Sequence, residues 1–539
     1  MAKKFCFKER MGNMSSSIVW IMLAFAAYMV LMIVIGAKYA GATKTSEDFF
    51  LGGRNLNGWV AALSAQASDM SGWLLMGLPG SVYAFGTGQA WIAIGLFLGT
   101  VCNWLFVSSR LRRYTICANN SLTLPAYLEN RFHDKKRVLL LVSSIVIVIF
   151  FLVYTASALT AGGKLFASVF GMDYKLALTI GALVILVYTF LGGFMAVCVT
   201  DFIQGMLMLV GVLLIPLVAY FMVGSENIVG IIGDSGVAGG ASSFLNIMED
   251  SGSRVSPIYI ISQLAWGLGY FGMPHILVRF MAVSSEKELK KSKVIAIVWV
   301  ALSLSFAVII GIVGRAFLYP TVLGVTTETS AENVFIELIT KLFVSDIGWP
   351  FIGGLFLCGV LAAIMSTADS QLLVTASAVA EDLFKGIFKK DAKEKTVLNV
   401  SRATVIVVAV LAYLISLNPD SSVMGLVSNA WAGFGAAFGP VILLSLYWKR
   451  VNLPGALAGI ISGAATVLIW DYVPMIHTGV LDAKGKEVLN TLGTHTGLYS
   501  LALGFVISLV LIVIVSLVTK RPSDEILQEF DEMQKMSVE

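Results

Sequence analysis

The feature that most constrains this chain is its series of apolar runs, each about as long as a helix that crosses a lipid bilayer. Such a helix needs roughly 20 predominantly apolar residues, and the 539-residue sequence contains thirteen runs of this kind. Only 13% of the residues are charged, against roughly 25% in soluble domains. The sequence therefore predicts an all-α polytopic membrane protein. The expected spans are residues 17–38, 58–84, 87–109, 137–168, 174–195, 198–223, 256–283, 293–317, 348–380, 400–418, 422–448, 454–474 and 497–519.

Positive charge collects in alternate connections between these runs. Cytoplasmic loops of membrane proteins carry an excess of Lys and Arg, so we expect the basic connections and the tail of residues 520–539 on the cytoplasmic side of a cell membrane. The acidic connections, residues 225–255 and 318–346, then lie outside. The basic connections are residues 109–137, 287–293, 385–395 and 449–450.

The same pattern places the N-terminal tail, residues 1–16, outside the cell. Four basic residues in this tail favour the opposite orientation, and the larger number of basic internal connections outweighs them: Lys3, Lys4, Lys8 and Arg10. A cleaved signal peptide is an alternative for the first run, because Ala40-Gly41-Ala42 resembles a cleavage site. The run is longer than the apolar part of an ordinary signal peptide, which favours a transmembrane helix.

A short polar segment, Ala67-Ser68-Asp69-Met70-Ser71-Gly72-Trp73, interrupts the second run halfway along its length. Irregular backbone survives at membrane depth only where it is buried in protein or lines a cavity. A carboxylate such as Asp69 costs about 2.5–3.5 kcal/mol at the bilayer centre and is by default functional. We therefore expect a broken helix whose unpaired carbonyls and half-helix ends face a central binding site.

A second interruption, Trp266-Gly-Leu-Gly-Tyr-Phe-Gly-Met-Pro274, lies five spans later. Three glycines and a proline within an apolar run weaken the helix there. Paired interrupted helices in corresponding positions of two halves mark the central site of a secondary transporter. Within one transmembrane domain, residues 17–519, we expect two inverted five-helix repeats at about 58–223 and 256–448. The extra helices are then residues 17–38, 454–474 and 497–519.

Hydroxyl and carboxyl groups gather on the ninth run. Ser366, Asp369 and Ser370 share one helix face, since residues three and four apart lie on the same side, and Thr367 is adjacent. Small, hard cations prefer oxygen ligands such as these. The alternative is that the Ser and Thr hydroxyls bond back to carbonyls of their own helix, which is common in membrane helices. The Ser-Thr pair beside an Asp favours a cation site.

Other candidate residues carry two interpretations each. Asp201 is either a site residue or a carboxylate at a helix start, favoured by the helix dipole. Arg54 is either a gate charge or an interfacial anchor. Four aromatic residues in or near the interruptions either wall an apolar pocket that accepts an amine or serve as ordinary packing residues: Trp73, Tyr154, Trp266 and Tyr270.

Several function classes lack their sequence signatures. The chain contains no H-E-x-x-H, Walker A or nucleophile-elbow motif, its four histidines do not cluster, and its five cysteines have no C-x-x-C spacing. It has no basic domain with interleaved aromatic residues for nucleic acid. The sequence therefore predicts neither an enzyme nor a nucleic-acid-binding protein, and it indicates no cofactor and no obligate protein partner.

At the interrupted helices the chain resembles the sodium/solute symporter family, and the likeness runs from about residue 20 to residue 520. The matching stretches are Leu51-Gly-Gly-Arg54; Ala61-Ala-Leu-Ser-Ala-Gln-Ala-Ser-Asp-Met-Ser-Gly-Trp-Leu-Leu-Met-Gly-Leu-Pro-Gly80; Gly267-Leu-Gly-Tyr-Phe-Gly-Met-Pro-His-Ile-Leu-Val-Arg-Phe-Met281; Met365-Ser-Thr367 with Gln371-Leu-Leu-Val374; and Ala430-Trp-Ala-Gly-Phe-Gly-Ala-Ala-Phe-Gly-Pro440.

The resemblance implies the leucine-transporter-type fold, a 5+5 inverted repeat with one extra helix before the core and two after it. It implies import of L-proline coupled to Na⁺ by alternating access. In this mechanism the two repeats rock, and Na⁺ and substrate raise each other's affinity. The alternative within the class is a symporter of another small solute, such as pantothenate or a different amino or carboxylic acid.

The resemblance also implies site residues. Backbone oxygens of Ala67, Met70 and Ala363 and the hydroxyls of Ser366 and Thr367 would hold Na⁺. Asp69 would support this site and its coupling to substrate without ligating the ion, and Arg54 would contribute to coupling. The substrate pocket would be lined by Ser68, Ser71, Gly72, Trp73, Tyr154, Trp266, Tyr270 and Pro274.

Asp369 departs from the family pattern, since relatives often carry a small hydroxyl or thiol residue there. Some members build a second Na⁺ site from hydroxyls at these positions and an Asp that matches Asp201. We therefore expect a candidate second cation site of Asp201, Ser366, Asp369 and Ser370, giving more than one Na⁺ per substrate or a proton-sensitive step. The alternative is a structural Asp369 bonded to neighbouring helix groups.

Overall fold

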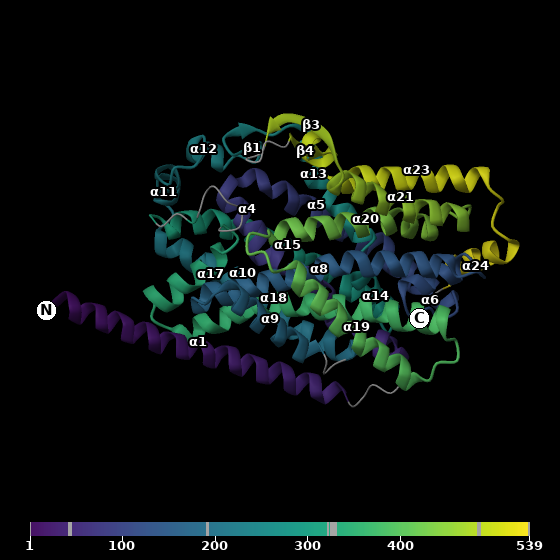
Figure 1. The fold of residues 1–539 in the computed structure, drawn as a ribbon, viewed down its shortest axis with the longest axis horizontal. Helices are drawn as coiled ribbons and strands as arrows, with labels where there is room; N and C mark the ends of the chain where they lie inside the picture. Colours follow the sequence, from purple (N-terminus) through teal and green to yellow (C-terminus); the bar gives the residue numbers. More distant parts are fainter. Residues whose placement is uncertain are drawn as a thin grey trace.

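The structure, a computed structural model, describes residues 2–40, 46–189, 193–320, 323, 331–481 and 487–536. Within these ranges the chain is almost entirely helical, and many of the long helices run along the long axis of the molecule (Figure 1). The N-terminal helix α1 (Ala2–Ala40) lies along one edge of the bundle. The last helix, α24 (Asp524–Lys535), caps the end of the bundle that lies farthest from the N-terminus in this view.

Each of the thirteen expected spans contains a helix. Among the described residues, ten helices are by themselves long and apolar enough to cross a membrane. The other three spans are the two interrupted ones, whose helices end at mid-depth, and α9 (Tyr174–Thr189), which has only 16 residues. The predicted polytopic all-α class is confirmed, and the shortfall in continuous helices comes from the interruptions and this short helix.

The first part of the chain forms these helical elements: α2 (Ser46–Leu51), η1 (Gly52–Arg54), α3 (Gly58–Asp69), η2 (Trp73–Gly77), α4 (Leu78–Phe85), η3 (Thr87–Gln89), α5 (Ala90–Cys102), η4 (Asn103–Val107), α6 (Ser108–Cys117), α7 (Leu124–Arg131), α8 (Val138–Phe170), α10 (Phe194–Val223), α11 (Ile228–Asp234) and α12 (Gly240–Phe244). The second part forms α13 (Pro257–Ala265), η5 (Trp266–Phe271), α14 (Pro274–Ala282), α15 (Glu286–Leu318), α17 (Val334–Ile339), η6 (Thr340–Asp346), α18 (Pro350–Ser377), η7 (Ala378–Phe388), α19 (Glu394–Ile415), α20 (Val423–Tyr447), α21 (Leu453–Tyr472), α22 (Leu492–Thr496) and α23 (Ser500–Val518). Two antiparallel hairpins pair β1 (Glu249–Asp250) with β2 (Ser253–Arg254) and β3 (Pro474–Leu481) with β4 (Glu487–Thr491).

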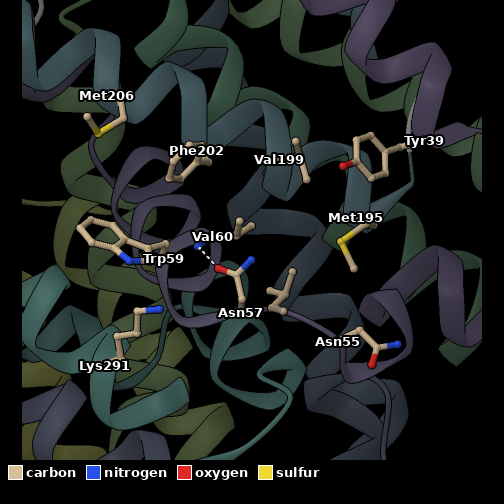
Figure 2. Close-up of a pocket in the computed structure, with 11 residues that line it drawn as sticks. Tyr39, Asn55, Asn57, Trp59, Val60, Met195, Val199, Phe202, Met206 and Lys291 are labelled. Atoms are coloured by element: carbon tan, nitrogen blue, oxygen red, sulfur yellow. Dashed lines mark hydrogen bonds between the residues drawn. The ribbon is translucent and has the colours of Figure 1, made fainter. Parts of the chain in front are cut away.

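Helix α18 is the most deeply buried long helix near the centre of the bundle. It packs against α1, α8, α10 and α3, and most of its side chains are buried. The outward faces of α10 and α23 instead expose large apolar side chains, for example Leu214, Phe221, Val506 and Val518. An apolar exterior around a buried centre is the pattern of a protein solvated by lipid. One groove opens in this exterior near the start of α3 (Figure 2).

The C-terminal helix α24 docks on the bundle through its apolar face. Phe530 and Met533 are buried against the end of α6, and the Phe530 ring meets the Tyr114 ring edge-on at 6.1 Å. The guanidinium of Arg131, itself fully buried, lies 5.5 Å from the Phe530 ring. His133 Nε2 lies 2.9 Å from a Glu529 carboxyl oxygen. The helix thus covers a buried cationic side chain of α7.

Candidate functional site

The first interrupted helix stops at the predicted position. Helix α3 begins after Asn57, whose side-chain oxygen accepts a hydrogen bond from Val60 N at 3.0 Å. It ends at Asp69, because Met70 has a non-helical backbone (φ −82°, ψ 71°) and the Ser71 N–H donates to the Asp69 carbonyl at 2.9 Å. The chain resumes helical form in η2 and α4. The interruption therefore leaves polar backbone groups in the buried centre of the molecule.

The second interrupted helix breaks through glycine and proline. After α13 the chain tightens into the 3₁₀ turn η5, Met273 is extended (φ −76°, ψ 106°), and α14 starts at Pro274. A Cβ atom on Gly269 would lie 1.9 Å from Trp431 Nε1, so only glycine fits there. The Trp431 indole in turn donates to the Trp266 carbonyl at 2.7 Å. Helix α20 thus packs closely on η5, with Trp431 occupying the space beside Gly269.

Asp69 joins the two interruptions. Tyr270 donates its hydroxyl hydrogen to Asp69 Oδ2 at 2.6 Å, and both side chains are buried. The Trp73 indole donates to the Asp69 carbonyl at 3.0 Å. The other carboxyl oxygen, Oδ1, has no hydrogen-bond partner in the described part of the chain. A buried carboxylate oxygen without a partner among the described residues is a candidate contact for a bound cation or donor.

The predicted Na⁺ ligands gather between α3 and α18. Ser366 Oγ lies 2.7 Å from the Ala67 carbonyl oxygen and 3.2 Å from that of Ala363, and Thr367 Oγ1 lies 3.1 Å from the Ala363 oxygen. All four residues are buried. Met70, the fifth predicted ligand, lies at the end of the same helix as Ala67. The two hydroxyls donate to these carbonyls as the structure stands, and their lone pairs are the groups a cation would use.

The residues predicted as a second cation site surround a guanidinium. Arg279 of α14 donates from Nη2 to Asp201 Oδ2 at 3.1 Å and to Ser370 Oγ at 2.6 Å, and from Nε to Ser64 Oγ at 3.1 Å. Ser64 Oγ donates to Asp201 Oδ2 at 2.7 Å. Asp369 stands next to this network, with Ser370 Oγ 3.4 Å from its Oδ1. Ser366 instead belongs to the oxygen cluster at Ala67.

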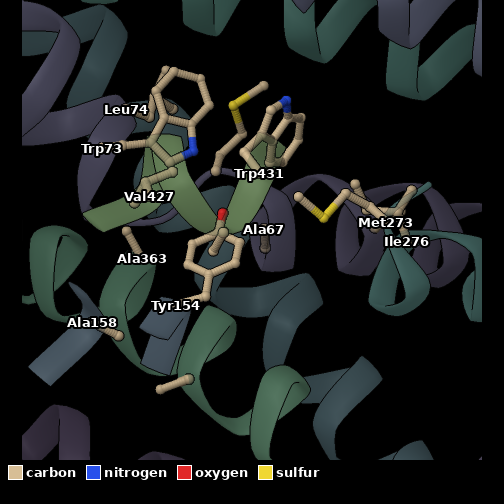
Figure 3. Close-up of a cluster of buried hydrophobic side chains, with 14 of the residues drawn as sticks. Ala67, Trp73, Leu74, Tyr154, Ala158, Met273, Ile276, Ala363, Val427 and Trp431 are labelled. Carbon is tan, nitrogen blue, oxygen red and sulfur yellow. The ribbon is translucent and has the colours of Figure 1, made fainter. Parts of the chain in front are cut away.

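The predicted pocket aromatics lie around the same centre. Figure 3 shows Trp73, Tyr154 and Trp431 grouped beside Ala67 and Ala363, with the Tyr154 hydroxyl directed toward the two indoles. This hydroxyl is buried and meets no hydrogen-bond partner among the residues described. The site therefore combines ring faces with unsatisfied polar atoms, which suits a small ligand that has an apolar body and polar ends.

The other predicted pocket residues lie at or beside the two helix interruptions. Ser68 turns its hydroxyl back to the Ser64 carbonyl at 2.8 Å, and Ser71 Oγ accepts from Trp73 N at 3.4 Å. Gly72 allows close approach to α8, because a Cβ there would lie 2.8 Å from the Ala161 methyl. Pro274 begins α14.

Trp266 lies on the side of the molecule that holds Asp250, whose carboxyl oxygen accepts hydrogen bonds from Gln89 and Tyr259. Its ring stacks on Tyr499 at 5.2 Å and lines a cavity of about 450 Å³. Gln89, Tyr259 and Asp471 also line this cavity. Trp266 therefore lies between this cavity and the buried centre of the molecule.

Arg54 anchors the segment before the first interrupted helix. Its guanidinium donates to the Met281 carbonyl at 2.6 Å, the Ser121 carbonyl at 2.9 Å and Asn120 Oδ1 at 2.9 Å. Burial and the neighbouring Arg112 charge lower the pKa of Arg54 to about 10, so it stays charged at neutral pH. These contacts favour the anchor interpretation of Arg54 and tie the start of α3 to the end of α14.

Comparison with known proteins settles the family. The profile described as "Sodium:solute symporter family" matches residues 49–463. The chain belongs to this family. It is 43% identical over 522 residues to the "Osmoregulated proline transporter OpuE" of Bacillus subtilis (strain 168), covering 96% of this chain and 98% of that protein. It is 44% identical over 513 residues to the "Sodium/proline symporter" of Escherichia coli (strain K12), covering 95% of each chain.

A solved structure confirms the symporter fold. A Na⁺-coupled sialic acid symporter, solved in a substrate-bound outward-open state, superposes with a TM-score of 0.73 at 21% identity and covers 94% of this chain and 98% of its own. At that identity the likeness concerns the fold alone. The leucine-transporter-type fold implied by the sequence resemblance is thereby confirmed for this sodium:solute symporter family member.

Two buried ion pairs of this symporter-family chain were missed by sequence reasoning. One is Arg279–Asp201. The other is Lys164 Nζ–Glu332 Oε2 at 2.5 Å, where Glu332 also accepts from Ser422 Oγ at 3.1 Å and from Met424 N at 3.2 Å. Both Lys164 and Arg279 are charges within apolar runs, a signal that by itself marks a residue facing the bundle interior. Glu332 lies within the acidic connection of residues 318–346 and gives no such signal.

Proposed function

We propose that this protein imports L-proline together with Na⁺ by alternating access. Relatives named as proline transporters or sodium/proline symporters match it at 43–44% identity over nearly their whole length. The observation that carries the proposal is the Asp69–Tyr270 contact between two interrupted helices, next to a cluster of buried carbonyl and hydroxyl oxygens. This arrangement supports a cation and a small amino acid held side by side at the centre of the molecule.

Uptake of labelled L-proline into proteoliposomes of the purified protein tests the function. We expect accumulation under an inward Na⁺ gradient, none under a matching K⁺ gradient, and loss of the signal with excess unlabelled proline. An absence of proline uptake in a preparation that still binds Na⁺ would discard the substrate while keeping the symporter class. A panel of pantothenate and other small amino and carboxylic acids would then identify the solute.

We also propose the arrangement in the membrane. Residues 58–223 and 256–448 form the two repeats, with 17–38, 454–474 and 497–519 as added helices. The end of the bundle that carries α24 and the basic connections faces the cytoplasm, because that end holds the excess of Lys and Arg. The N-terminus then lies outside and the C-terminus inside.

For Na⁺ we propose ligation by the carbonyl oxygens of Ala67, Met70 and Ala363 and by the hydroxyls of Ser366 and Thr367. For proline we propose a pocket walled by the rings of Trp73, Tyr154, Trp266 and Tyr270, with Ser68, Ser71, Gly72 and Pro274 lining it. The unsatisfied Tyr154 hydroxyl and Asp69 Oδ1 support polar contacts to a ligand there. Asp69 links the two sites without ligating the ion.

Replacement of a Na⁺ ligand is expected to change the Na⁺ requirement. Each of Ser366→Ala and Thr367→Ala should raise the Na⁺ concentration for half-maximal uptake about 10- to 100-fold, the equivalent of one lost bond to a charged group. Uptake measured at a series of Na⁺ concentrations checks this. Ser303→Ala removes another buried serine, whose hydroxyl donates to the Val300 carbonyl of its own helix at 3.3 Å, and should leave the Na⁺ dependence unchanged. An equal effect of all three variants would contradict the site.

For Asp369 we propose a second cation or proton. Asp369 and Asp201 are fully buried, and Ser370 Oγ connects them to one network, since it lies 3.4 Å from Asp369 Oδ1 and accepts from the Arg279 guanidinium that pairs with Asp201. Asp201 Oδ1 also has no partner among the described residues. Asp369→Asn should lower the Na⁺ Hill coefficient of uptake or flatten its pH dependence. If both stay as in the wild type, the structural interpretation of Asp369 holds instead.

A further inference from the structure

A groove of about 820 Å³ opens on the outside of the bundle beside Lys291, which belongs to the basic connection of residues 287–293 (Figure 2). The first turn of α3, with Asn57, Trp59 and Val60, forms one wall, and α10 forms another with Met195 and Phe202. Lys291 of α15 points into it. Neither the proposed transport path nor the family comparison uses this groove.

The α10 wall is apolar and continuous with the lipid-facing surface. Met195, Val199, Phe202 and Met206 follow one another at intervals of four, three and four residues, so they form one stripe along the helix. Met206 is 42% exposed, and the exposed stripe goes on toward the other side of the membrane through Val210 and Leu214. A chain of methylene groups lying on this stripe would stay within the hydrocarbon region.

The other end of the groove is polar and basic. Lys291 is 45% exposed, and its ammonium lies 3.7 Å from Glu288, beyond hydrogen-bond distance. Glu288 Oε2 already accepts from the Gly58 N–H at 2.5 Å. Lys287 and Lys290 are exposed on the same turns of α15. Positive charge at the membrane surface attracts anionic lipids, and a tryptophan such as Trp59, half exposed here, favours the interface.

We propose that this groove binds an anionic phospholipid. One acyl chain lies on the α10 stripe, and the phosphate lies at Lys291 with Asn57 beside it. The lipid contacts the first turn of α3 and therefore touches the proposed inner end of the interrupted helix. This inference does not depend on which solute the protein transports.

Quenching of tryptophan fluorescence by brominated lipids tests the site in nanodiscs that hold the full-length protein. Brominated phosphatidylglycerol and brominated phosphatidylcholine are compared at equal mole fractions in an unbrominated phosphatidylcholine background. The signal of Trp59 is the difference between the wild type and Trp59→Phe. Phosphatidylglycerol should quench it at a mole fraction about five-fold lower than phosphatidylcholine.

Lys291→Gln should bring the two lipids within about two-fold of each other. Lys395→Gln, an exposed lysine on another connection at the same end, should keep the wild-type preference. Inorganic phosphate added in excess should not remove the quenching, because the acyl chain holds the lipid in place. Equal quenching by both lipids in the wild type, or an unchanged preference in Lys291→Gln, would overturn the proposal.

Discussion

Arg279→Gln is expected to abolish measurable proline uptake and to destabilise the protein by about 3–5 kcal/mol, the cost of breaking a buried ion pair from one side. The guanidinium holds groups from three other elements: Ser64 of α3, Asp201 of α10 and Ser370 of α18. Removing it leaves the buried Asp201 carboxylate with the Ser64 hydroxyl as its one remaining donor among the described residues.

A double-variant cycle separates the pair from a general packing effect. Asp201→Asn combined with Arg279→Gln removes both charges, so the double variant should recover part of the thermal stability that Arg279→Gln loses. Thermal unfolding in detergent and Na⁺-driven uptake are measured for all four proteins. Arg521→Gln, whose exposed side chain pairs with Asp524 at 3.5 Å, serves as the control and should behave as the wild type. Additive losses in the double variant would show that the two charges act separately.

Asp69→Asn is expected to raise the Na⁺ concentration for half-maximal uptake by about 100-fold, because it removes one partner of a buried charge interaction. The amide keeps the size of the carboxyl group and still accepts the Tyr270 hydrogen bond. The substitution removes the negative charge next to the proposed Na⁺ and proline sites, together with the carboxyl oxygen that has no partner among the described residues. Without this charge, the coupling between Na⁺ binding and proline binding should weaken.

Tyr270→Phe is the matched comparison for Asp69→Asn. It keeps the charge of Asp69 and removes one hydrogen bond, so it should cost about 10-fold in the proline KM and leave the Na⁺ requirement closer to that of the wild type. Uptake measured over a grid of Na⁺ and proline concentrations distinguishes the two effects. The same Na⁺ shift in both variants would indicate that the contact, and not the charge, supports the ion site.

The interruptions were predictable because they are local. Glycine, proline and polar residues in an apolar run weaken a helix wherever the rest of the chain lies, and α3 and α13 end where these residues occur. The pairing of Asp69 with Tyr270 joins residues 201 positions apart, so no spacing rule reveals it. The proposed ligands of Na⁺ and proline stay predictions, although the structure gathers most of them at one centre.

Arg279 shows why part of the site was missed. Its position inside an apolar run marks it as facing the interior, but its partners come from helices distant in sequence. A cation site is recognised in a sequence by side chains that carry oxygen atoms. The group that lies beside Asp201 is instead the guanidinium of Arg279. Trp431 was missed for a similar reason, since its fit against Gly269 depends on how α20 crosses η5.

The position of α24 in the sequence determines when its contacts with the bundle can form during synthesis. Phe530 follows the membrane helices in the sequence, whereas Arg131 and Tyr114, which it covers, lie in the first quarter of the printed sequence. Until α24 has been synthesised, the guanidinium of Arg131 lacks this cover, although the membrane helices that precede α24 have already been made. The packing at this end of the bundle is therefore completed only after α24 has been made and has docked on α6.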